Sequence, residues 1–424
     1  MTVSPLSDSI TFKKSGFVAK NRFLKSAMTE RLCTFSQEDH GARGKSTPEY
    51  VRLYEEWGKG EIGVIVLGNI PIDRTALEAA GNIVIDKRSS FDPVENIKPV
   101  IEASKAHGSI IIGQLTHGGR QTSENINSQP LSASDIQCPS FAGMAFAEPK
   151  PASLEEIDAI VEGFAYGAEV LYKAGAHGAQ LHGAHGYLLS QFLSARINKR
   201  TDDYGGSLEN RMRIIIRIIN EIKQRIPEDK FILSIKMNSA DFADGGLTPE
   251  ESSTVAQQLD KLGLDLIELS GGSYESMAFE HKKESTIKRE GYFIEFAEHI
   301  RPHLTNAVLA VTGGFRGKAA MERAVAESST DIIGLARPLT AEPCFCRDIL
   351  SGAISEAKPN KVPTAVQTGT SIAQIGAIGH GKSIPDLSDE KSAQECLDAV
   401  MGKAPPKQKV DGHNTTEYAG QKEE

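Results

Sequence analysis

The sequence predicts an α/β fold, a closed (β/α)8 TIM barrel followed by a polar C-terminal extension. Three observations lead to this prediction. Short β-rich runs alternate with helical patterns from Asn21 to about Leu350, eight such runs can be counted, and no break in composition divides them. Several runs are continuously apolar, as expected of parallel strands that are buried on both faces. An open doubly wound sheet with a second domain is the alternative.

The eight predicted strands are short runs rich in β-branched and aliphatic residues, separated by turn residues and helical patterns. Residues 62–67, Ile-Gly-Val-Ile-Val-Leu, are a clear example. The predicted strands are Arg22–Met28, Gly63–Ile70, Ser109–Leu115, Ala179–His182, Phe231–Met237, Leu264–Ser270, Ala307–Thr312 and Asp331–Leu335.

Helices are predicted between these runs. Ser153 and Thr248 each begin a capping box, with a glutamate three residues later, and Gly175 and Gly263 supply the matching stops. A broad apolar stripe predicts a further helix over Leu208–Ile226. Other predicted helices are Pro48–Lys59, Pro93–His107, Gly291–Leu304, Lys318–Ser328 and Glu342–Leu350.

The sequence changes character near Ser351, where polar residues and prolines replace the alternating pattern. We therefore predict two regions, a catalytic barrel over 1–350 and an extension over 351–424. The extension is expected to be partly disordered or to wrap over the surface, above all from Gly381 onward.

The composition excludes several classes of partner. The 424 residues carry 47 Lys and Arg against 56 Asp and Glu, a net charge of −9, which argues against nucleic acid or an anionic membrane as partner. No apolar run is long enough to predict a membrane span, and the first residues do not resemble a secretory signal. Five cysteines without a Cys-x-x-Cys motif indicate reduced thiols, so we expect a cytoplasmic protein.

The stretch Ala179–Arg213 contains the strongest candidate site. His182, His185 and Tyr187 crowd into six residues where an apolar run ends. If this segment curls into a turn, both imidazoles can donate ring N–H groups to one electronegative atom, with a phenol nearby to give a proton. Two histidines and a tyrosine in this position favour a functional site over ordinary packing.

Other candidates follow the remaining strands, because chemistry in this fold occurs at the carboxyl ends of the strands. Ala27, Met28 and Thr29 provide small groups and a hydroxyl after the first run, and Gly68 permits a flat ligand to approach closely. Gln114 ends the third run with an amide that both donates and accepts hydrogen bonds.

Residues after the last two strands predict a phosphate site. Gly313 and Gly314 follow the seventh strand, and Ala336 and Arg337 follow the eighth, which are the usual phosphate positions of this fold. Lys236 is a cation within an otherwise apolar strand and needs an anion or a ligand acceptor. A phosphorylated planar cofactor fits this combination, and FMN is the obvious candidate.

Within that prediction, two side chains contact the flavin ring. Lys236 would stabilise the reduced ring from the N1/C2 carbonyl edge, and Gln114 would bond to the pyrimidine edge.

Two motifs, His182-Gly-Ala-His185-Gly-Tyr187 and Arg200-Thr-Asp-Asp-Tyr-Gly-Gly, closely resemble the Old Yellow Enzyme family of FMN-dependent ene-reductases. The resemblance spans about Val18 to Ile349. It implies that NADPH or NADH reduces FMN, which then gives hydride to the β-carbon of an activated alkene.

The resemblance also implies roles for individual residues. His182 and His185 would bind the carbonyl or nitro oxygen of the alkene, and Tyr187 would protonate its α-carbon. Thr29 matches the position whose hydroxyl bonds to the flavin. The family's other flavin positions match Ala27, Met28, Gln114, Ala336 and Arg337.

The chain departs from the family at several positions. Lys236 stands where many members have arginine, and Ala336 where glycine is usual. Arg31 and Thr116 replace aromatic residues of bacterial and yeast relatives, so both bear on substrate preference. Tyr274, with Phe279 in the same loop, is expected to stack on the nicotinamide or the substrate.

Two other functions remain open from the sequence. In a metal-dependent barrel lyase or hydrolase, His182 and His185 would be ligands, but a third ligand is not evident and no metal is expected. A flavin-binding protein without catalysis is the other alternative. The expected partners are a small activated alkene and a nicotinamide, and the sequence is compatible with a homodimer.

Overall fold

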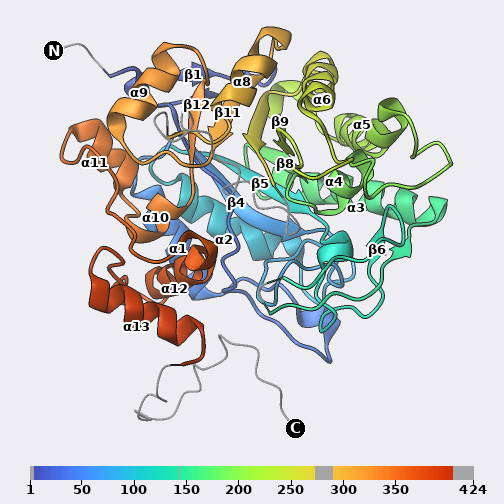
Figure 1. Cartoon of the computed structure of the whole chain (residues 1–424), viewed down its shortest axis with the longest axis horizontal. Coiled ribbons are helices and arrows are strands. Elements are labelled where there is room, and N and C mark those ends of the chain that lie inside the picture. The colour runs from blue at the N-terminus through green and yellow to red at the C-terminus, as the bar shows by residue number, and fades with distance from the viewer. Residues whose placement is uncertain (1–3, 142, 273–289, 404–424) are drawn as a thin grey trace.

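The structure is a computed structural model that describes residues 4–141, 143–272 and 290–403. Eight parallel strands close into a barrel, which confirms the predicted fold and excludes the open sheet (Figure 1). In barrel order the strands are β3 (Phe23–Lys25), β4 (Val64–Pro71), β5 (Ile110–Thr116), β8 (Gly178–Gly183), β9 (Ile232–Asn238), β10 (Leu266–Ser270), β11 (Val308–Thr312) and β12 (Ile332–Leu335).

Helices follow the strands and surround the barrel, as Figure 1 shows. Both predicted capping boxes are present, at Ser153 and at Thr248, so the sequence signals marked true helix starts. The helices up to Ser351 are α1 (Pro48–Gly58), α2 (Pro93–Lys105), α3 (Leu154–Lys173), α4 (Leu188–Leu193), α5 (Leu208–Arg225), α6 (Pro249–Lys261), α8 (Ile294–Ile300), α9 (Lys318–Ala326), α10 (Arg337–Ala341) and α11 (Phe345–Ser351).

The barrel interior changes from apolar to polar along the strands. The first inward residues of the strands form an apolar cluster, closed from below by Phe12 and Ala19 of the hairpin β1 (Ile10–Thr11) and β2 (Val18–Ala19). Nearer the carboxyl ends, the Ser26 hydroxyl reaches Glu268 of β10, although β3 and β10 are not neighbours in the barrel. Such a bond can only cross the interior, so this end of the barrel is lined with polar groups.

The C-terminal extension contains two helices that the sequence did not predict. They are α12 (Gln367–Gly379), which packs against α1 and α10, and α13 (Glu390–Val400), which packs against α12 (Figure 1). Gly369 and Gly379 weaken the helical pattern of α12, yet a Cβ at these positions would crowd Val400 and Leu32, so they allow close helix packing.

Within the described ranges, no helix combines the length and the apolar character needed to cross a bilayer. Tyr274 and Phe279 lie outside the described residues.

Candidate active site at the barrel mouth

A cavity of about 380 Å³ lies over the carboxyl ends of the strands, within the size range of cofactor and ligand sites. The structure brings most of the predicted site residues to its wall. Those that line it are Ala27, Met28, Thr29, Arg31, His185, Tyr187, Lys236, Gly313, Ala336 and Arg337. Five others lie outside the lining, namely Gly68, Gln114, Thr116, His182 and Gly314.

The two histidines form a hydrogen-bonded pair at one end of the cavity. His182 Nε2 and His185 Nδ1 lie 3.3 Å apart. The far nitrogen of each ring is also engaged, since Thr116 Oγ1 lies 3.1 Å from His182 Nδ1 and Ser270 Oγ lies 2.8 Å from His185 Nε2. The Tyr187 ring completes the cluster, with its centroid 4.6 Å from that of His182.

This arrangement allows both histidines to act as donors toward a ligand. If Thr116 and Ser270 donate their hydroxyl protons to the far nitrogens, the facing nitrogens of His182 and His185 both carry hydrogen. In that state the two facing nitrogens no longer bond to each other, and a ligand oxygen lying beside both of them would accept two hydrogen bonds. Thr116 thus supports His182 from behind, and its predicted contact with substrate stays a prediction.

Both imidazoles are neutral at physiological pH. Burial lowers the pKa of His182 well below its ordinary value, and the neighbouring His185 and Lys236 lower it further. Burial and Lys236 lower the pKa of His185 to about 3, although Glu268 opposes the shift. The pair can therefore offer N–H donors to a ligand but no positive charge.

A strained turn places His185. Its φ of 61° lies in the left-handed region, which residues with a side chain rarely adopt, and Gly186 follows with φ of 80°. The turn is held on both sides, because the His185 N–H donates to Asn238 Oδ1 at 3.1 Å and Gln121 Nε2 donates to the His185 carbonyl at 3.0 Å. Strain that is held so firmly is typical of functional positions.

These shifts predict how stability depends on pH. Between about pH 6.5 and pH 3 the two histidines are protonated in the unfolded chain but stay neutral in the folded protein. The stability that they confer above pH 6.5 is therefore lost as the pH falls through this range. His185→Asn should reduce the slope of unfolding free energy against pH by about one proton between pH 6 and pH 4. Urea unfolding across that range measures it, and an unchanged slope would contradict a neutral His185.

Lys236, which the sequence analysis expected to need an anionic partner, pairs with Glu268. Its Nζ lies 3.1 Å from Glu268 Oε1 and donates to Ser26 Oγ at 2.6 Å. Lys236 is 4% exposed and still lines the cavity, so it is a buried cation with one side open to a ligand.

Glu268 is the centre of this polar network. It accepts hydrogen bonds from Thr312 Oγ1 at 2.6 Å and from Gln180 Nε2 at 2.9 Å, and Gln114 in turn donates to Gln180 at 2.7 Å. Burial would raise the pKa of Glu268, but Lys236 and the hydrogen bonds outweigh it and hold that pKa below its ordinary value. Gln114 therefore belongs to the layer that supports Lys236.

Thr29 and Arg31 share a carboxylate that the sequence reading did not single out. Thr29 Oγ1 donates to Glu78 Oε2 at 2.7 Å, and Arg31 Nη2 lies 3.7 Å from Glu78 Oε1. Glu78 is 6% exposed and lines the cavity. The Thr29 hydroxyl already donates its hydrogen bond to Glu78 in this arrangement, so donating to a flavin instead would require it to change partners.

Gly68 packs against a buried side chain, which by itself requires a glycine at this position. A Cβ at Gly68 would collide with the Glu30 carboxylate, and the Gly68 N–H donates to the Tyr54 hydroxyl at 2.6 Å. Lys25 lies 3.7 Å from Glu30 and 4.3 Å from the centre of the Trp57 ring. Burial lowers the pKa of Lys25 to about 8, although Glu30 opposes this shift.

The predicted phosphate end holds Gly313, Ala336 and Arg337 at the cavity wall. Gly313 and Gly314 have φ of 133° and 91°, a backbone conformation that favours glycine. A Cβ at Gly314 would also collide with the carbonyl oxygen of Glu290. The turn itself therefore explains Gly314, and only its neighbour reaches the cavity.

Glu268, Glu78 and Lys25 are the charged residues that sequence reasoning missed. Glu268 carried a readable signal, since it is a charge inside the apolar run Leu264–Ser270 and pairs in register with Lys236 on β9. Lys25 carried the same signal in β3. Glu78 lies in a loop after β4 and carried none.

Comparisons with known proteins agree with this geometry. The model of the NADH:flavin oxidoreductase / NADH oxidase family matches residues 8–356. The NADH-dependent flavin oxidoreductase nadA of Aspergillus parasiticus is 38% identical over 409 residues, which cover 95% of this chain and 90% of that protein. An NADPH dehydrogenase of Bacillus subtilis is 32% identical over 337 residues, or 77% of this chain and 89% of that protein.

Solved structures show the same fold. The Old Yellow Enzyme homologue from Zymomonas mobilis superposes with a TM-score of 0.69 at 22% identity and covers 84% of this chain and 94% of its own. The family match and the relatives together identify this protein as an FMN-containing oxidoreductase that uses NADH or NADPH. The chain belongs to the NADH:flavin oxidoreductase / NADH oxidase family, the family of Old Yellow Enzyme.

Proposed function

We propose that this protein is an ene-reductase, which uses NAD(P)H to reduce the activated C=C bond of an α,β-unsaturated carbonyl or nitro compound. The observation that carries the proposal is the His182–His185 pair, whose facing nitrogens lie 3.3 Å apart beside the cavity. Two neutral N–H donors aimed at one point suit a carbonyl or nitro oxygen, and they withdraw electrons from a conjugated double bond.

The cavity residues fit FMN. Arg337 offers a guanidinium for the phosphate and Lys236 a buried cation for the electron-rich edge of the ring, while Gly313 leaves room beside them. Met28 and Ala27 add apolar surface at the same wall. A flavin held by these residues would supply the hydride chemistry that links NAD(P)H to the alkene.

The protein's own residues then have separate tasks. His182 and His185 bind the substrate oxygen and orient the double bond. Tyr187, 6% exposed and at the cavity wall, is placed to give its phenolic proton to the α-carbon. Arg31 and Glu78 border the same space and would influence which alkenes are accepted.

Anaerobic turnover tests the proposal. The oxidised protein is mixed with NADH or NADPH, and cyclohexenone, maleimide and a nitroalkene are then supplied in turn. We expect the flavin absorbance to bleach with nicotinamide and to return with at least one alkene, in step with formation of the saturated product. Bleaching that no member of this panel reverses would contradict the proposed reaction.

A further inference from the structure

Helix α12 forms one wall of the active-site cavity, although it lies beyond residue 356, where the family match ends. Thr368, Ser371, Ile372 and Ile375 line the cavity at the spacing of a single helix face. Ser371 is 7% exposed, and its hydroxyl has no hydrogen-bond partner among the residues that the structure describes. A buried polar group without a partner at a cavity wall indicates that this helix faces a ligand.

The first residue of α12 holds Arg337. Gln367 Oε1 accepts a hydrogen bond from Arg337 Nη1 at 2.6 Å, and Gln367 Nε2 donates to the Val362 carbonyl at 2.8 Å. Both ends of the amide are engaged, so its orientation is fixed. Val362 belongs to the small core of the extension, which also contains Leu387, Ala393 and Cys396. The extension's own packing therefore determines where Gln367 points.

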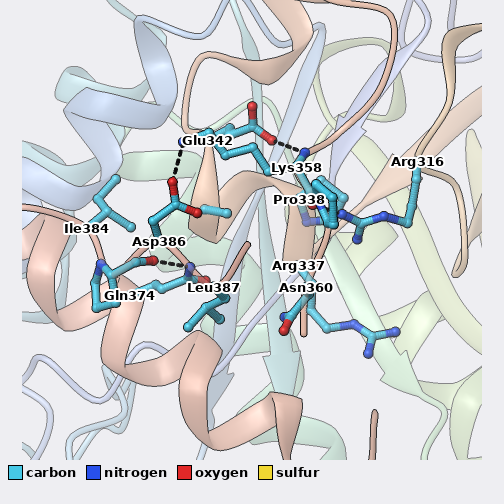
Figure 2. A pocket seen from close by; sticks show the side chains of 13 residues that line it. Arg316, Arg337, Pro338, Glu342, Lys358, Asn360, Gln374, Ile384, Asp386 and Leu387 are labelled. Atoms are coloured by element: carbon cyan, nitrogen blue, oxygen red, sulfur yellow. Dashed lines mark hydrogen bonds and ion pairs between the residues drawn. The ribbon is translucent and has the colours of Figure 1, made fainter. Parts of the chain in front are cut away.

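Arg337 lines both the active-site cavity and a second cavity of about 300 Å³, and Figure 2 shows the second cavity. The charged groups around the second cavity already have partners. Lys358 Nζ pairs with Asp386 at 3.0 Å, and the backbone N–H of Lys358 donates to Glu342 at 2.8 Å, as Figure 2 shows. Arg316 donates to backbone carbonyls of the extension.

Arg337 differs from these groups. No carboxylate within the described parts of the chain forms an ion pair with it, and its side-chain hydrogen bonds are to Gln367 and Tyr292. Burial lowers the pKa of Arg337, and Arg316 lowers it further, although Tyr292 opposes the shift. A half-buried guanidinium at a cavity wall, held by an amide and not by an anion, is available to an anionic ligand.

We propose that the C-terminal extension is part of the FMN site, in which Gln367 is a positioning residue that presents Arg337 to the phosphate of FMN. The proposal rests on the placement of that phosphate at Arg337. It assigns to α12 a share of cofactor binding that the family-matched region alone does not provide.

Titration of the apoprotein with FMN and with riboflavin tests the proposal, because the two flavins differ only in the phosphate. Flavin fluorescence reports both dissociation constants. Gln367→Ala should weaken FMN binding about tenfold, because Arg337 loses its fixed orientation, and should change riboflavin binding less than twofold. Gln367→Glu places a carboxylate beside Arg337 that competes with the phosphate, so it should weaken FMN binding further and again leave riboflavin unaffected.

Gln394→Ala is the matched control, since it removes the same side chain from α13, where the amide bonds to Asp398 on an exposed face. It should change neither constant. Equal losses for FMN and riboflavin in the Gln367 variants, or FMN binding within twofold of wild type, would overturn the proposal. The flavin titration contains no alkene, so its result does not depend on the proposed alkene reduction. A protein that reduces no alkene would contradict the proposed reaction, and the Gln367 variants would still test the role of the extension in FMN binding.

Discussion

Tyr187→Phe is expected to slow reduction of the alkene by about 10²- to 10⁴-fold, the usual contribution of a positioned proton donor. The phenol lies at the cavity wall, with its ring centroid 4.6 Å from that of His182, and phenylalanine keeps the shape while removing the proton. Reduction of the flavin by NAD(P)H needs no proton from Tyr187, so that half-reaction should stay within twofold of wild type. Stopped-flow absorbance measures the two half-reactions separately.

The control for this prediction is Tyr172→Phe, which removes a phenol from a ring that packs against Phe231 on the outer side of the barrel. Both half-reactions should be unchanged in that variant. If Tyr187→Phe slows the two half-reactions equally, Tyr187 supports the site as a whole and is not the proton donor.

Lys236→Met is expected to destabilise the protein by about 3–5 kcal/mol, because it leaves Glu268 as a buried carboxylate without its cation. Glu268 is fully buried and cannot recruit water to replace the lysine. The variant should also lose FMN, since a cation disappears from the cavity wall. Denaturant unfolding of the apoprotein isolates the first effect, and the flavin absorbance of the purified protein reports the second.

The double variant Lys236→Met with Glu268→Gln separates a lost ion pair from a packing defect. With both charges gone, the hydroxyls of Ser26 and Thr312 can still bond to the new amide. The double variant should therefore be clearly more stable than the sum of the two single changes predicts. Additive losses would mean that the two charges do not interact in the folded protein.

The barrel could be predicted because its signals are local. Runs such as 62–67 read as strands from their own composition, and Ser153 marks the start of α3 through a capping box that the structure contains. Lys236 could be recognised as a buried cation because it interrupts an apolar run. The same signal was present at Glu268 on the neighbouring strand, because this glutamate also interrupts an apolar run.

Other features depend on packing that is remote in sequence. Helix α12 is rich in glycine and hydroxyl residues and has weak propensity of its own, and it forms because α1, α10 and α13 pack against it. The structure gives Gly68 and Gly314 packing roles, against the Glu30 carboxylate and the Glu290 carbonyl, while their predicted ligand contacts stay predictions. Sequence identifies a glycine, but only the fold shows what lies against it.

The placement of His182 and His185 is a third case. The motif identified the two residues but not their arrangement. The pair and the hydroxyls of Thr116 and Ser270 behind it are brought together by three different strands, β8, β5 and β10. These contacts determine which ring nitrogens can donate.

Titration with a phenol such as p-hydroxybenzaldehyde tests the paired-histidine site most directly, because a phenolate oxygen should occupy the point between His182 and His185 and lie over the flavin. Wild-type protein is predicted to develop a long-wavelength charge-transfer band on titration. The variant with His182→Ala and His185→Ala should retain its flavin absorbance but show no such band. A band of unchanged strength and affinity in the double variant, or its absence in the wild-type holoprotein, would contradict the placement of the histidine pair beside the flavin.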